Sequence, residues 1–189
     1  MSNTFNNYLK YRKYKGLSED FDSELKENEY LFEEVFNYIG VFLNQNILIE
    51  TYLDEILMHH LSKNSRGING AGFRSLILNS RAFGINDKYT VFRELTKSTF
   101  LFYKLVNEKE TKTMSRLFRK IIEHRNIIAH NRFAIDIKMK IAVFTIYEKG
   151  IQKDIKIDKA LMIEYLENAN KVIDYLKEFS KTLEVHENR

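Results

Sequence analysis

Three residues that could act on a phosphate lie in the stretch IIEHRNIIAHNRF, residues 121–133, an otherwise apolar helical run. Arg125 offers a permanently charged fork of donors that suits a phosphate. His130 can take or give a proton near neutral pH. Together they could cleave RNA without a metal: His130 would move the proton of the attacking 2′-hydroxyl or of the leaving oxygen, and Arg125 would stabilise the charged phosphorane.

The spacing places these groups around one groove of a helix. Asn126 and His130 are four residues apart, so they share a face. Arg125 precedes His130 by five residues, about 140° around the axis. Apolar neighbours such as Ile122 and Ile128 supply core contacts nearby.

Spacing alone leaves other interpretations open. Arg119 and His124 repeat the same Arg-x4-His interval within RKIIEH. A histidine near a helix end can simply interact with the last carbonyls, and Arg125 can pair with a carboxylate such as Glu123. The motif could then be structural, and alanine variants would lower thermal stability and change nothing else.

RNIIAHN resembles the signature of the HEPN superfamily, in which an arginine is followed after a few residues by a histidine. Asn directly after Arg and a small residue before His are familiar there, and both favour Arg125 and His130 over Arg119 and His124. HEPN domains are helical bundles with a long early helix and the motif on a late helix. The order here is similar over roughly residues 25 to 185, although only the short motif is specific.

The resemblance implies a metal-independent endoribonuclease of toxin, abortive-infection or antiviral (phage) defence systems. Such proteins typically form homodimers in which two motif helices meet, and their products carry a 2′,3′-cyclic phosphate and a 5′-hydroxyl. Carried onto this chain, Arg125 would bind and polarise the phosphate, His130 would be the general acid or base, and Asn126 would orient His130 or the substrate.

One position departs from the family pattern. Arg132 stands two residues after the histidine, where the toxin subgroup silenced by a nucleotidyltransferase carries a modified tyrosine. That antitoxin mechanism is therefore in doubt, although some antitoxin or regulatory partner remains open. Arg132 is interpreted as a phosphate contact, and Asn131 and Arg119 complete the expected substrate-binding set. Arg116 and Lys120 would also belong to this RNA-binding rim of basic residues on the motif helix; the alternative interpretation is a solvated helix face.

A second function class fits the same residues: a non-catalytic helical dimer that binds RNA, a nucleotide or a partner protein. It predicts that Arg125→Ala weakens binding, that His130→Ala does little, and that no RNA is cut. The sequence does not indicate the RNA target or whether activity needs a trigger.

Composition bounds the remaining possibilities. The chain has 189 residues, no Cys, no Pro and 7 Gly, which favours one domain dominated by long helices and excludes cysteine-based chemistry. A net charge of +4 indicates a mild preference for anionic partners. Without an N-terminal apolar segment or a run of roughly 20 apolar residues, we expect a cytoplasmic protein with no membrane span. No metal site and no cofactor are expected.

The chain is expected to fold as a mainly α, HEPN-like bundle with a small β-hairpin before the last helix. Residues 1–22 form a basic lead-in, and residues 23–185 form the single domain. Apolar periodicity predicts helices at 23–61 (or two helices meeting near Gly40), 73–84, 87–108, 114–131 and from Asp158 onward.

Three local features are also expected. Asp87 and Asp158 are predicted N-caps, and residues 109–113 a charged turn. Residues 134–157 alternate and are rich in β-branched side chains, with a turn at residues 149–150, so they are predicted to form the hairpin. Glu50 and Asp54 share one face of the long helix, where surface or salt-bridge roles are favoured over a role near the site.

Overall fold

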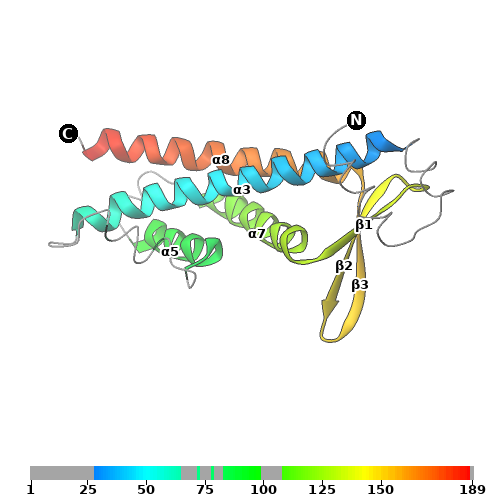
Figure 1. The fold of residues 1–189 in the computed structure, drawn as a ribbon. Coiled ribbons are helices and arrows are strands. Elements are labelled where there is room, and N and C mark those ends of the chain that lie inside the picture. The colour runs from blue at the N-terminus through cyan, green and yellow to red at the C-terminus, as the bar shows by residue number, and fades with distance from the viewer. Residues whose placement is uncertain (1–27, 65–71, 73–77, 79–82, 99–107, 188–189) are drawn as a thin grey trace. The chain divides into compact units, whose positions relative to one another are not determined.

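The computed structural model describes residues 28–64, 72, 78, 83–98 and 108–187. This part of the chain is mainly helical, as the sequence predicts, with one small antiparallel sheet (Figure 1). The elements are α3 (Glu29–Asn64), α5 (Ile85–Ser98), α7 (Glu108–His130), β1 (Arg132–Asp136), β2 (Ile141–Glu148), β3 (Ile151–Ile157) and α8 (Lys159–Glu187). The predicted lead-in at 1–22 and nearly all of the predicted helix at 73–84 lie outside the described residues.

The chain divides into two compact units. The sheet unit comprises residues 1–42 and 126–164, and the helical unit comprises residues 43–125 and 165–189. Whether they behave as the single domain expected from the sequence stays a prediction. Both units draw on α3, α7 and α8, because each of these helices contributes residues to both. α5 belongs to the helical unit alone.

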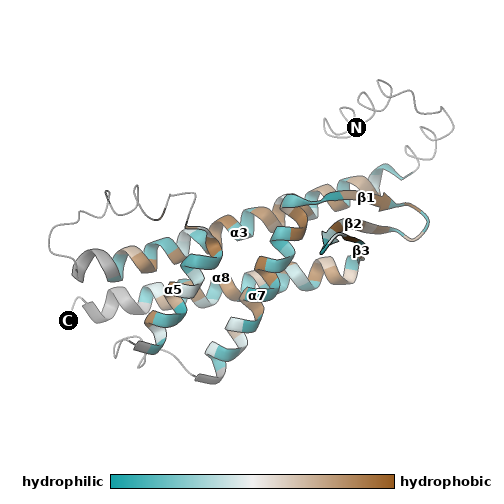
Figure 2. Ribbon diagram, turned by 90° about the horizontal axis from the view of Figure 1, so that it is seen from below, coloured by the Kyte–Doolittle hydropathy of each residue, from teal (hydrophilic) through white to brown (hydrophobic). Residues whose placement is uncertain are grey.

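Apolar faces of four helices form the core of the helical unit. Brown and teal segments alternate along these helices in Figure 2, as expected where each has one apolar side. Tyr89 of α5 stacks on Phe118 of α7 with ring centroids 4.3 Å apart. Phe92 of α5 meets Phe179 of α8 edge to face at 5.2 Å. These ring contacts pack α5 against α7 and α8. Further buried core residues are Ile49, Leu53, Ile56, Leu57, Ile121, Val172 and Leu176.

Polar contacts fix α3 against α8 and α5 within the helical unit. The side-chain amide of Gln45 donates to the carbonyl oxygen of Leu166 at 3.2 Å and to the side-chain oxygen of Asn170 at 2.8 Å. Lys88, buried on α5, donates to Glu50 at 2.6 Å and to Asp54 at 3.0 Å on α3. Glu50 and Asp54 therefore do form salt bridges, as their shared face indicates.

The sheet unit is built around three antiparallel strands in the order β1-β2-β3. The β2–β3 hairpin closes through Lys149 and Gly150, whose φ angles of 53° and 81° match the two-residue turn that strand twist favours. Phe36 of α3 meets Phe133 of β1 edge to face at 5.6 Å, and Phe133 stacks on Phe144 of β2 at 5.6 Å. Aromatic rings thus fasten the sheet to the first turns of α3.

Two helix starts show different capping. At α8, the carboxylate of Asp158 accepts from Leu161 N at 2.8 Å, so the predicted N-cap is confirmed. At α5 the prediction was wrong by one turn. Gly84 is the N-cap, and Asp87 is the third helical residue, whose carboxylate accepts from Gly84 N at 3.0 Å. Asp87 therefore supplies the acidic half of a capping box.

Of the two alternatives expected around Gly40, the structure has the single helix, because α3 runs from Glu29 to Asn64 without a break. Two other boundaries differ from expectation. Residues 109–113 belong to α7 rather than to a turn, because Glu and Lys are good helix formers despite their polarity. The predicted hairpin at 134–157 is a three-stranded sheet that begins at Arg132, since residues 132–136 pair with β2.

Candidate nucleic-acid site

The final turns of α7 carry Arg125, Asn126 and His130 on one continuous helix. Arg125 is half-buried, whereas Asn126 and His130 are exposed. Between them, Ile128 is buried and Ile127 is half-buried, whereas Ala129 is exposed. The helix therefore uses its isoleucines for packing and leaves the four-residue step from Asn126 to His130 on its outer side.

The end of α7 is closed by Asn131. Its side-chain amide donates to the carbonyl oxygen of Ile127 at 3.1 Å and to that of Asn126 at 3.4 Å. Ile127 is one of the last four residues of α7, whose carbonyls a helix terminus leaves without intrahelical donors. Asn131 thus has an observed capping role, and its expected substrate contact stays a prediction.

Arg132 begins the sheet immediately after this cap. It is exposed and stands opposite Thr145 in the β1–β2 pairing. Because the backbone of Arg132 is paired within the sheet, the position of its Cα is fixed by the strand. The expected phosphate contact of Arg132 remains a prediction that this position permits.

His124 has the opposite environment from His130. It is fully buried, and its ring lies on that of Tyr165 with centroids 3.5 Å apart and planes 3° apart. Burial lowers the pKa of His124 to about 4, because the charged imidazolium is disfavoured away from water. This histidine stays neutral at physiological pH and packs as an aromatic core residue.

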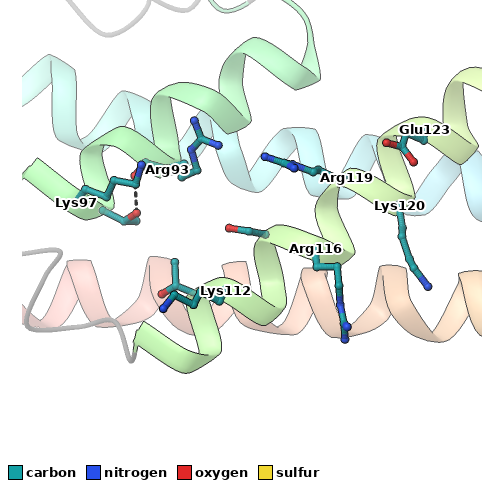
Figure 3. Close-up of a pocket in the computed structure, with 10 residues that line it drawn as sticks. Arg93, Lys97, Lys112, Arg116, Arg119, Lys120 and Glu123 are labelled. Atoms are coloured by element: carbon teal, nitrogen blue, oxygen red, sulfur yellow. Dashed lines mark hydrogen bonds between the residues drawn. The ribbon is translucent and has the colours of Figure 1, made fainter.

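Arg119, the other half of that pair, lines a groove between α5 and α7 in the helical unit (Figure 3). The groove has a volume of about 830 Å³. Six basic side chains line it together with a single acidic one, Glu123, among the described residues. The basic residues are Arg93 and Lys97 of α5 and Lys112, Arg116, Arg119 and Lys120 of α7.

Glu94 partly balances the α5 side of this groove. It pairs with Arg93 at 3.1 Å and with Lys97 at 3.2 Å. The hydrogen bond from Lys97, followed by that from Arg93, holds the pKa of Glu94 below its ordinary value. These pairs are exposed and contribute little stability.

Sequence reasoning singled out Arg116, Arg119 and Lys120 of α7, and it missed Lys112 of the same helix and both cations of α5. Arg93 and Lys97 are four residues apart and so share a helix face, a signal that the sequence does carry. What the sequence does not carry is the packing of α5 on α7 through Tyr89 and Phe118, which brings the two basic faces together.

The described residues hold no group of three or more side chains placed to ligate a metal. Among the same residues, no helix is both long enough and apolar enough to cross a membrane.

Comparisons of the chain with protein-family models, with curated proteins and with solved structures find no match.

Proposed function

We propose that this protein is a HEPN-type, metal-independent endoribonuclease, acting as a homodimer in phage defence or as a toxin in the cytoplasm. The observation that carries the proposal is the outward placement of Asn126 and His130 on α7, beside a half-buried Arg125. The buried state of His124 adds support, because it removes the competing copy of the same spacing from contact with a substrate.

The reaction needs one base, one acid and one stabilised anion. A base takes the proton of an RNA 2′-hydroxyl, whose oxygen attacks the adjacent phosphorus. The bond from phosphorus to the 5′-oxygen breaks, and an acid returns a proton to that oxygen. The products are a 2′,3′-cyclic phosphate and a 5′-hydroxyl. His130 serves as the acid or base, and the Arg125 guanidinium stabilises the charge on the phosphorane.

Dimerisation supplies what one helix lacks. One α7 end offers a single histidine, whereas the reaction uses an acid and a base at the same time. Two α7 ends related by a twofold axis would bring two arginines and two histidines to one phosphate. Asn126, one turn before His130, is placed to orient that imidazole or the substrate.

The test is RNA cleavage by purified protein in EDTA. We expect the wild type to cut and to leave cyclic-phosphate ends, while a substrate with a 2′-deoxy sugar at the scissile position stays intact. His130→Ala should lose activity and keep its fold, as checked by thermal unfolding. RNA that is bound but never cut would instead favour the non-catalytic binding dimer.

His124→Phe is the matched control. It changes a histidine of the same helix with the same Arg-x4 spacing, and it keeps an aromatic ring against Tyr165. It should retain cleavage. A strictly monomeric wild type that still cuts RNA would contradict the composite dimer site while leaving the ribonuclease assignment in place.

A further inference from the structure

We propose that the groove between α5 and α7 binds the phosphate backbone of single-stranded nucleic acid without regard to base sequence. The inference rests on the proposed function in one respect: cleavage of RNA by α7 is the reason to expect a nucleic acid, rather than another polyanion, in this groove. It assigns a binding role to Arg93, Lys97 and Lys112, for which no such expectation came from the sequence, together with Arg116, Arg119 and Lys120.

The first argument is the linear order of charge on α7. Lys112, Arg116 and Lys120 follow one another at four-residue steps, so they form one row along the helix. The row extends about 12 Å, at 1.5 Å per residue. Charges spread along a line suit consecutive phosphates of a chain, whereas a single phosphate would be held by charges that converge on a point.

A second row lies beside the first and borders α5. Ser115 and Arg119 are again four residues apart, and both line the groove. In Figure 3 Arg119 extends from α7 towards α5, where Arg93 lies across the groove. A strand in the groove would meet guanidinium groups from both helices, and guanidinium forks bind phosphate oxygens with two parallel hydrogen bonds.

The third argument is the imbalance of charge on the α7 side. Glu94 is shared by the two cations of α5. Neither Arg116 nor Arg119 forms an ion pair with any residue that the structure describes, and Glu123 is the one acid among the described residues that line the groove. Two permanently charged side chains are thus available to an outside anion.

The residues that line the groove also indicate which part of the strand they contact. Its described residues include no aromatic side chain, so bases have no ring on which to stack. Affinity must come from phosphate contacts, which release counterions and make binding strongly dependent on salt. An acidic protein segment would satisfy the charge equally well; the cleavage motif on the same helix favours nucleic acid.

The experiment measures binding of a fluorescent single-stranded DNA oligonucleotide of about 12 nucleotides, a length within the range of known single-strand sites. DNA lacks the 2′-hydroxyl and so cannot be cleaved by the proposed reaction, which separates binding from chemistry. Fluorescence anisotropy is recorded for full-length wild type, Arg116→Gln/Lys120→Gln and the control Lys171→Gln/Lys177→Gln. The control removes the same charge from exposed positions of α8 in the same unit.

We expect the groove variant to bind at least about tenfold more weakly at moderate salt. Its slope of log affinity against log salt should be smaller by about 1.4, since each lost phosphate contact accounts for about 0.7 on single strands. The control should match the wild type in slope. Equal losses in both variants, or no loss in the groove variant, would overturn the proposal.

Two further outcomes separate the possible failures. Poly-L-glutamate that displaced the oligonucleotide at equal charge concentration would overturn the phosphate assignment in favour of an acidic protein partner. His130→Ala should bind the oligonucleotide as the wild type does. If groove-dependent binding holds while RNA is never cut, the ribonuclease proposal fails and the groove proposal stands. If RNA is cut and Arg116→Gln/Lys120→Gln cuts it as well as the wild type does, the groove proposal fails and the ribonuclease proposal stands.

Discussion

α7 carries Arg-x4-His twice, at Arg119 and His124 and again at Arg125 and His130, and the two histidines lie in opposite environments. His124 is fully buried against Tyr165, and His130 is exposed at the helix end. Six residues separate the two, which turns the second copy by about 120° around the helix axis. The imidazole of His124 therefore lies in the core, whereas His130 lies on the solvent-exposed side of the helix.

The difference shows that identical spacing does not define a site. The five-residue interval fixes only the angle between an arginine and its histidine. Which pair can meet a substrate depends on how the whole helix is rotated, and that is set by Phe118 and Ile121, which are fully buried. The two arginines also differ: Arg119 is exposed and lines the basic groove, whereas Arg125, which belongs to the proposed motif, is half-buried.

The largest expected contrast is between the two arginines. Arg125→Gln should lower kcat for RNA cleavage by about 10²–10³-fold, since it removes a donor aimed at charge that develops in the transition state. Arg119→Gln should instead raise KM and leave kcat nearly unchanged, because a groove contact acts on binding. Steady-state kinetics on one oligoribonucleotide distinguishes these effects. A fall in kcat for Arg119→Gln as large as that for Arg125→Gln would end the proposed division of roles.

The second contrast concerns stability and pH. The folded-state pKa of His124, about 4, lies below the ordinary value of 6.5 because of burial. The unfolded chain takes up this proton first as pH falls, so stability present above pH 6.5 is lost as the pH drops towards 4. The loss from this group is at most about 3 kcal/mol.

His124→Phe isolates that contribution, because it keeps the aromatic contact and removes the titrating group. Urea unfolding at several pH values should show a shallower decline for this variant than for wild type between pH 6.5 and 4. Parallel curves would mean that His124 is accessible to protons in the folded state, and the contrast with His130 would then weaken.

Features that depend on local sequence signals could be predicted, whereas those that depend on tertiary contacts could not. Asp158 and the Lys149–Gly150 turn were predictable because their signals are local: a side chain that caps a helix and a glycine in a turn that requires positive φ. The preference for Arg125 and His130 over Arg119 and His124 rested on the Asn and the small residue of RNIIAH and stays a prediction, although of the two histidines His130 is the exposed one.

What failed depended on distant partners. Residues 134–136 were expected in the hairpin, but β1 contains only five residues and is defined by its pairing with β2, so its separation from β2 and its start at Arg132 were missed. Lys88 is buried because Glu50 and Asp54 lie on α3, far away in sequence. The α5 half of the groove depends on the packing of Tyr89 against Phe118. Patterns within a short segment of sequence cannot predict such contacts, because the partners are far apart in the chain.

The smallest expected effect is at the cap beside His130. Asn131→Ala removes two hydrogen bonds to carbonyls of the last turn and should lower the free energy of unfolding by about 1 kcal/mol. Thermal or urea unfolding measures this loss, and cleavage kinetics on the same variant test the expected substrate contact. A raised KM would support that contact; an unchanged KM would leave Asn131 with the capping role alone.

The most direct test of the account is chemical rescue at the exposed histidine. RNA cleavage in EDTA is measured for His130→Ala with and without added imidazole, next to wild type and His124→Phe. The account predicts that His130→Ala is inactive, that imidazole restores part of its activity because the position is open to solvent, and that His124→Phe cuts as wild type does. Full cleavage by folded His130→Ala without imidazole would contradict the assignment of proton transfer to His130.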